Sequence, residues 1–335
     1  MLLTSAITAI FILKLITYGF FKLNSFMAQN IVTEVLMPVA IGVIMLGLGL
    51  SLTVADFKRV VVYPKAMIIG LVCQMLLLPL ICFAIVLISD LPPALAVGFM
   101  LLSASPGGAS ANLYSHLSKG DVALNVSLTA VNSVLTLISL PLIVNASLAY
   151  FMESGQDVPM PFRKVIEVFS VVLVPVVLGM LVRFRFPGFA VKAEKTVKIA
   201  SAAFLAIIII LAVSQQYELV AKYFKEVGIT ALVFNLASMS LGYFVPQLFK
   251  VSKTQAISIG MEIGIHNGTL AMFIAMNAIG NPMMAIPAAI YSLIMFFTAA
   301  GFGYLVNYGK GENSKMLLSY RSNNPHGLRL LVHTL

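Results

Sequence analysis

Residues 66–89 form a stretch long enough to cross a membrane without a single charged side chain. A helix needs about 20 mostly apolar residues to cross the hydrocarbon core of a bilayer. Similar stretches recur along the 335 residues, and only 10% of the residues are charged, against about 25% in soluble domains. A chain with so few charges cannot cover a water-facing surface, so the sequence predicts a single all-α, polytopic membrane domain.

Ten apolar runs, bounded by charges, glycine, proline or polar clusters, predict ten membrane-spanning helices. The predicted spans are 3–24, 31–53, 64–89, 92–118, 121–150, 162–186, 193–214, 226–249, 254–280 and 283–308. The first is the weakest, because Lys14 lies inside it. Residues 1–26 are therefore a true helix, a signal-like segment or an extension ahead of a start at Met27. The membrane domain is placed at 27–310, followed by a cytoplasmic tail at 311–335.

The basic residues are unevenly divided between the two sides of these spans. Fifteen of the 21 lysines and arginines fall on one side and five on the other, with Lys14 inside the first span. Because basic loops stay in the cytoplasm, we expect a multi-pass protein of the cell inner membrane with both termini inside. The net charge of +9 then follows from topology and indicates no nucleic-acid partner.

The fourth and ninth spans share an unusual composition. Residues 105–112 and 262–269 place glycine, asparagine and hydroxyl side chains at mid-membrane depth. The two spans lie five apart and so run in opposite directions, which predicts two inverted repeats at about 1–150 and 160–308. Irregular backbone is tolerated at this depth only beside protein or a water-filled cavity. A matching pair of interrupted spans is typical of the binding site of a secondary transporter.

Glu262 is the only acidic residue placed deep inside a predicted span. A carboxylate at bilayer depth costs about 2.5–3.5 kcal/mol unless it is paired, hydrated or bound to a cation. The neighbouring spans hold no lysine or arginine to neutralise it. We therefore interpret Glu262 as part of an ion or proton site, and the alternative is a protonated or hydrogen-bonded structural glutamate.

Several oxygen-bearing residues could complete a site for a hard cation such as Na⁺. Asn112 lies in the interrupted part of the fourth span, and Asn125 and Thr129 stand at i and i+4 on one face of the fifth. The alternative for Asn125 is a hydrogen bond that joins two helices. Gln74 is a further candidate in the third span, and carbonyl groups around Ser110 and Ile263 would add ligands.

His266 stands at i+4 from Glu262 and is a candidate proton acceptor, ligand or hydrogen-bond partner. The half-helices of interrupted spans point their N-termini inward. Free amides after Gly108 and around Asn267 would attract a carboxylate through the positive end of the helix dipole.

Other chemistry finds no support in the sequence. No phosphate-binding loop is present, so no ATPase subunit is expected, and no hydrolase or dinucleotide motif indicates an enzyme. Cys73 and Cys82 stand in one apolar run and predict neither a disulfide nor a metal site beyond sodium. The Gly-Leu-Gly-Leu sequence at 47–50 is typical of close helix packing.

Six ordered motifs between residues 31 and 308 resemble the bile acid:sodium symporter family, with the character of a bacterial-type member. They lie at 46–57, 64–66, 74, 105–108, 120–124 and 262–267. The resemblance implies two inverted five-helix repeats, panel and core domains, and broken fourth and ninth helices that cross near the midplane. It also implies sodium-coupled symport of a small organic anion by alternating access, with the anion bound between the domains.

The resemblance implies two sodium sites and an anion site. The first sodium site would use Asn112, Asn125, Thr129 and Glu262, and the second Gln74, Glu262, Ile263, Ile265 and His266. The substrate-binding positions would be Gly108, Ala109, Ser110, Asn267 and Gly268.

The chain departs from the bile-acid-type pattern at three positions of these sites. Ala111 and Asn125 replace hydroxyl residues, and His266 stands where glutamine is usual, so a proton could substitute for the second sodium ion. The stretch 291–296 also lacks polar groups seen near the substrate in some relatives. A bile acid, pantoate, pantothenate or a keto acid all stay open as the anion. A proton-coupled carrier and a membrane sensor that binds the anion without moving it are the alternative functions.

Overall fold

A computed structural model describes residues 37–152, 162–193, 196–197, 199–200, 203 and 217–308. The predicted span 3–24, most of 193–214, and the tail 311–335 lie outside these residues. In chain order the main elements are α2 (Met37–Ser51), α3 (Val54–Val62), α4 (Pro64–Val72), η2 (Cys73–Leu77), α5 (Leu78–Ser89), α6 (Pro93–Ala104), α7 (Ala109–Leu117), α8 (Val122–Phe151), α9 (Phe162–Arg185), α11 (Tyr217–Leu248), α12 (Lys253–Gly264), α13 (Gly268–Phe273), η3 (Ile274–Ile279), η4 (Pro282–Ala285) and α14 (Ile286–Asn307).

The described part of the chain is helical, and its long helices are apolar. By length and composition four helical stretches can cross a membrane, namely Pro64–Ser89, Val122–Phe151, Ala221–Leu248 and Pro282–Asn307. Shorter apolar helices cover Ile41–Ser51, Pro93–Ala104 and Gly268–Ile279. The prediction of an all-α, polytopic membrane protein is therefore supported.

Helix ends follow local chemistry, which is why several predicted boundaries match. The predicted span 64–89 coincides with the helical stretch Pro64–Ser89. Proline stands in the first turn of α4, where its missing N–H leaves no bond unmade, and Asp90 ends α5 in a left-handed conformation with φ 46°. Asp121 caps α8, because its side chain accepts a 3.0 Å hydrogen bond from the Leu124 amide.

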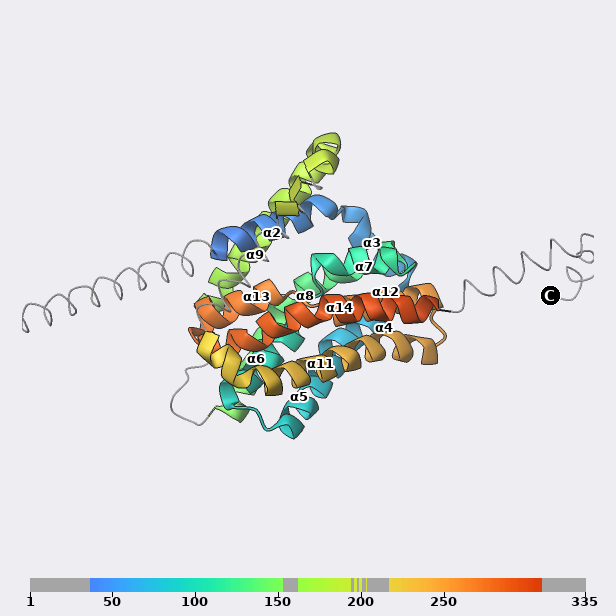
Figure 1. The fold of residues 1–335 in the computed structure, drawn as a ribbon. Helices are drawn as coiled ribbons and strands as arrows, with labels where there is room; N and C mark the ends of the chain where they lie inside the picture. The colour runs from blue at the N-terminus through green and yellow to red at the C-terminus, as the bar shows by residue number, and fades with distance from the viewer. Residues whose placement is uncertain are drawn as a thin grey trace, which may run out of the picture.

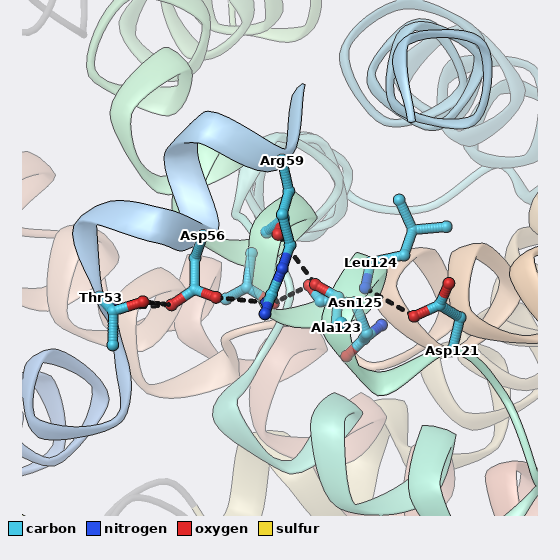
Figure 2. A network of polar contacts seen from close by, with 9 residues as sticks. Thr53, Asp56, Arg59, Asp121, Ala123, Leu124 and Asn125 are labelled. Carbon is cyan, nitrogen blue, oxygen red and sulfur yellow. Dashed lines mark hydrogen bonds and ion pairs between the residues drawn. The ribbon is translucent and has the colours of Figure 1, made fainter. Parts of the chain in front are cut away.

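The short helix α3 occupies a segment that we expected to be a connection. Thr53 and Asp56 form a capping box, in which the Thr53 amide and hydroxyl donate to Asp56 Oδ2 at 2.6 and 2.7 Å. Arg59 donates to Asp56 Oδ1 at 2.6 Å. Figure 2 shows Arg59 directed from α3 toward the first turn of α8, near Ala123 and Asn125. This polar network lies where α3 packs against α8.

Helix α11 begins nine residues before the predicted start at 226, at Tyr217. The added turns carry Lys222 and Lys225, whose side chains are exposed. Charged residues such as these have good helix propensity, so a helix can continue past the apolar segment that marks its membrane part.

The helices pack in two groups. Helices α2 and α9 pack closely on each other and contact the rest chiefly through α13 and η3. A Cβ on Gly179 would lie 2.6 Å from the Leu46 carbonyl oxygen, so glycine permits this approach. In the larger group, α11 lies lengthwise beside α12 and α14 (Figure 1). This larger group holds all the residues of the candidate site.

Candidate functional site

Two interrupted helices meet in the interior of the larger group. Helix α6 ends at Ala104 and α7 resumes at Ala109, while α12 ends at Gly264 and α13 resumes at Gly268. Gly107 and His266 pair as an isolated antiparallel bridge. The Gly108 amide donates to the Ile265 carbonyl oxygen at 2.7 Å, and the Asn267 amide donates to the Pro106 carbonyl oxygen at 2.9 Å. Each break thus supplies hydrogen-bond partners to the other, and we call residues 105–108 and 265–267 the crossing.

The Glu262 carboxylate lies fully buried beside the crossing, in the last turn of α12. The Thr129 hydroxyl donates to Oε2 at 2.6 Å, and the Asn132 side-chain amide donates to Oε1 at 3.2 Å. Both donors come from α8 and are neutral. No residue in the described ranges forms an ion pair with Glu262. The site therefore holds a carboxylate with hydrogen bonds but without a positive partner.

Gly107 is required by this carboxylate. A Cβ at position 107 would overlap the Glu262 carboxyl group. The crossing backbone therefore passes directly over the carboxylate, and a side chain at this position would push the two apart.

Of the residues proposed for the first sodium site, Thr129 contacts Glu262 directly, and Asn125 contacts α12 one turn earlier. Asn125 donates through Nδ2 to the Ser258 carbonyl oxygen of α12 at 2.8 Å. Its Oδ1, and Oδ1 of Asn112 on α7, are buried and have no hydrogen-bond partner among the residues that the structure describes. Helix α7 packs against both α8 and α12. Unpaired amide oxygens, a buried carboxylate and a hydroxyl are the kinds of ligand that a hard cation prefers, so these residues fit sodium by their chemistry.

The residues proposed for the second sodium site are brought only partly together. Gln74 Nε2 donates to the Ser105 carbonyl oxygen at 3.0 Å, and His266 Nδ1 lies 3.4 Å from the same oxygen. Gln74 Oε1 and His266 Nε2 are both buried, and neither finds a partner in the described ranges. The Ile265 carbonyl oxygen already accepts from the Gly108 amide. Ile263 is buried in the last turn of α12.

His266 packs against two aromatic rings, which also contact each other. It stacks on Phe234, with 5.8 Å between ring centroids and 11° between planes, and lies 5.4 Å from the ring of Tyr291. Glutamine at this position would lack these ring contacts. Histidine in place of glutamine at position 266 therefore changes the packing around the crossing as well as the atom that could bind a cation.

A second group of contacts around the crossing was missed from the sequence. Asn235 Nδ2 on α11 and the Tyr291 hydroxyl on α14 donate to the Gly264 carbonyl oxygen at 2.8 and 2.9 Å. Asn235 Nδ2 also lies 2.8 Å from the Tyr291 hydroxyl oxygen. We call Asn235 and Tyr291 the clamp, because they hold the last carbonyl of α12 before the break.

Asn132 was also missed, although its spacing could have revealed it. It stands at i+3 from Thr129 and i+7 from Asn125, which places all three on one face of α8. All three side chains are fully buried. Extending the i and i+4 pair of Asn125 and Thr129 along the same face of the helix would have included Asn132.

The positions expected to bind an anion lie at the starts of α7 and α13. The Gly108 amide donates to the Ile265 carbonyl oxygen, and the Gly268 amide donates to the His266 carbonyl oxygen at 3.0 Å. The Gly268 amide, which we expected to be free, is therefore already paired. The next amides, of Ala109 and Ser110, stand in the first turn of α7, where no intrahelical acceptor exists. Asn267 caps α13 through its oxygen, which leaves its side-chain N–H groups to donate to a ligand.

Comparison with known proteins decides the family. Residues 38–223, more than half of the chain, match the model of the Sodium Bile acid symporter family. The chain belongs to this family. It is 29% identical over 253 residues to the "Uncharacterized sodium-dependent transporter YocS" of Bacillus subtilis, covering 76% of this chain and 77% of that protein. It is 25% identical over 302 residues to the mouse "Ileal sodium/bile acid cotransporter", covering 88% of this chain and 86% of the relative.

A plant relative matches over a smaller share of its length. The rice "Probable sodium/metabolite cotransporter BASS2, chloroplastic" is 28% identical over 261 residues, which cover 78% of this chain but 61% of the rice protein. The family consists of transporters, so the expectation that this chain is not an enzyme is confirmed.

Proposed function

We propose that this chain is a secondary active transporter that carries sodium and a small organic anion together across the membrane by alternating access. The sodium dependence that the relatives' names state supports the coupling ion. Their names also divide between bile acid and unspecified metabolites, so the proposal names the anion only by class. A bile acid, pantoate, pantothenate and keto acids all belong to that class.

The observation that carries the proposal is the buried Glu262 carboxylate without a positive partner. At bilayer depth an uncompensated carboxylate costs about 2.5–3.5 kcal/mol or more. Two neutral donors reduce this penalty and do not cancel the charge. The unpaired oxygens of Asn112 and Asn125 would repel a second anion and attract a cation. Sodium bound among these oxygens would supply the missing positive charge.

The same geometry links sodium to the anion. Glu262 and Gly107 are in direct proximity across the crossing, so a cation held by Glu262 would also fix the segment that leads into α7. The first amides of α7 and the side chain of Asn267 then face an anion from both half-helices. A cation behind the crossing and a carboxylate in front of it would stabilise each other, and this mutual stabilisation couples the two ligands.

The separate packing of α2 and α9 supports a panel that moves against a core holding the crossing. We propose ten spans in two inverted repeats, the interrupted helices being the fourth and ninth. We place the protein in the cell inner membrane with a cytoplasmic C-terminus.

The test replaces Glu262 with glutamine in the purified full-length protein. Glutamine has nearly the same shape and keeps an oxygen for Thr129, so we expect a folded protein that has lost its thermal stabilisation by Na⁺ relative to K⁺. Uptake of labelled taurocholate, pantoate and pyruvate into proteoliposomes under a Na⁺ gradient is measured alongside. The matched control is Glu226→Gln, because the Glu226 side chain is exposed on α11.

Normal Na⁺ stabilisation and uptake in Glu262→Gln would end the proposal. Uptake that ignores Na⁺ and collapses with a protonophore would favour a proton-coupled carrier. Anion binding without any flux would favour a sensor.

A further inference from the structure

Thr136 is a buried hydroxyl residue of α8 that makes none of the bonds seen for the other hydroxyl side chains of this helix. In membrane helices serine and threonine usually donate to the carbonyl four residues earlier. On α8 this bond is made by Ser127, Ser133 and Ser147, while the Thr129 hydroxyl donates to Glu262 instead. Thr136 could donate to the Asn132 carbonyl in the same way, yet its buried Oγ1 has no partner within the described part of the chain. The hydroxyl is therefore oriented for another ligand.

Asn132 presents a second unpaired oxygen one turn earlier on the same face. Its Nδ2 is fixed by the 3.2 Å hydrogen bond to Glu262 Oε1, so its Oδ1 must face away from that carboxylate oxygen. Oδ1 is buried and finds no donor in the ranges that the structure describes. Residues at i and i+4 are neighbours on a helix surface, so Asn132 and Thr136 lie on the same face of α8.

The facing element offers a third oxygen. The π-helical turn η2 packs against α8, and the Ser139 hydroxyl lies 3.2 Å from Met75 Sδ, which brings this part of α8 against η2. Gln74, the residue before Met75, is buried, and its Oε1 lacks a donor among the described residues. π-helical turns often mark functional sites. The three oxygens are all acceptors, which suits a cation.

We propose that Asn132 and Thr136 form an additional sodium position on α8, next to the Glu262 carboxylate, with Gln74 as its neighbour on η2. The inference rests on the proposed sodium coupling and goes beyond it, because the residues carried over from the family end at Thr129 on this helix. It also gives the chain a second oxygen-lined position in place of the one that His266 alters.

The test compares three threonine variants in the purified full-length protein. Thr136→Val removes the hydroxyl and keeps the shape, and Thr136→Ser keeps the hydroxyl. Thr230→Val is the matched control, because Thr230 is buried on α11 and donates to the Glu226 carbonyl oxygen at 2.8 Å. The apparent melting temperature is titrated with Na⁺ at constant ionic strength, with K⁺ as the replacing cation.

We expect the wild type, Thr136→Ser and Thr230→Val to titrate with a Hill coefficient above one. For Thr136→Val we expect a Hill coefficient near one and a half-saturating Na⁺ concentration raised roughly tenfold. The residual response would then belong to the site at Glu262.

A Thr136→Val protein that titrates like the wild type, with a melting temperature changed equally in Na⁺ and K⁺, overturns the additional position. Thr136 would then be an unpaired hydroxyl or a ligand of a bound water only. Glu262→Gln separates this failure from that of the proposed function. If the wild type responds to Na⁺ and Glu262→Gln does not, the main site stands whatever Thr136→Val does. If the wild type itself ignores Na⁺, both proposals fall.

Discussion

Removing both residues of the clamp tests how the end of α12 is held beside the crossing. The Gly264 carbonyl oxygen lies in the last turn of the helix, where no intrahelical donor follows. It accepts from Asn235 Nδ2 and from the Tyr291 hydroxyl. In Tyr291→Phe the Asn235 donor stays, and in Asn235→Leu the Tyr291 donor stays. Only the double variant leaves the Gly264 carbonyl oxygen without a hydrogen-bond donor.

The expected magnitudes follow from that redundancy. Hydrogen bonds between membrane helices contribute about 0.6 kcal/mol on average, so each single variant should lose about that much stability. A buried acceptor left without any donor costs about 1–3 kcal/mol. The double variant should therefore lose up to about 3 kcal/mol, against about 1.2 kcal/mol for the two singles added, which is a coupling of up to about 2 kcal/mol.

The assay is reversible unfolding in mixed micelles with increasing SDS, followed by circular dichroism, for the wild type, both singles and the double variant. A parallel cycle of Tyr291→Phe with Ser147→Ala is the control, because Ser147 bonds to the Ile143 carbonyl of its own helix and shares no partner with Tyr291. Additivity of the clamp cycle within about 0.5 kcal/mol would refute a shared clamp. A larger coupling in the control cycle would show that the effect is not local.

Two further substitutions test the geometry of the crossing and of the helix that faces it. Gly107→Ala should remove Na⁺-dependent stabilisation, because the added Cβ would overlap the Glu262 carboxyl group. The control is Gly301→Ala, whose Cβ would meet no atom within 4 Å and which should leave the Na⁺ titration unchanged. Equal Na⁺ titrations of the two variants would contradict the close approach of Gly107 to Glu262. Asp121→Ala should destabilise the protein by about 1 kcal/mol in the same unfolding assay, because the Leu124 amide loses its cap. Asp121→Asn should restore most of that loss, since asparagine caps helices equally well, and a loss as large as that of alanine would show that the charge matters more than the cap.

Most helix boundaries in the described residues could be predicted from the sequence, because local residue chemistry determines where these helices end. Proline at 64, a left-handed residue at 90 and an aspartate cap at 121 mark boundaries that the apolar pattern also marks. The helix that was not predicted, α3, also begins at a local capping motif. Between the predicted spans 31–53 and 64–89 no helix is predicted, because the segment 54–62 is short and carries three charged residues, yet the capping box of Thr53 and Asp56 starts α3 there.

The candidate site could be predicted only in part from the sequence. Contacts between helices depend on how each helix is rotated about its axis, and a single sequence does not reveal that rotation. Glu262 stood out because a carboxylate in an apolar span needs an explanation, and Thr129 does lie against it. Asn235 and Tyr291 gave no such signal. A single asparagine or tyrosine in a membrane helix is commonplace, and their shared acceptor is a backbone carbonyl, which has no sequence signature.

The crossing restricts how such a molecule can change shape. Its two breaks satisfy each other through the pairs Gly108–Ile265 and Asn267–Pro106, and separating them would leave four backbone groups unpaired at membrane depth, each costing several kcal/mol. Helices α2 and α9 have no share in these bonds and reach the larger group chiefly through α13 and η3. A change of access that leaves the crossing intact is therefore far less costly than one that opens it. Sodium at Glu262 would then act by fixing the crossing as one body, against which the remaining helices move.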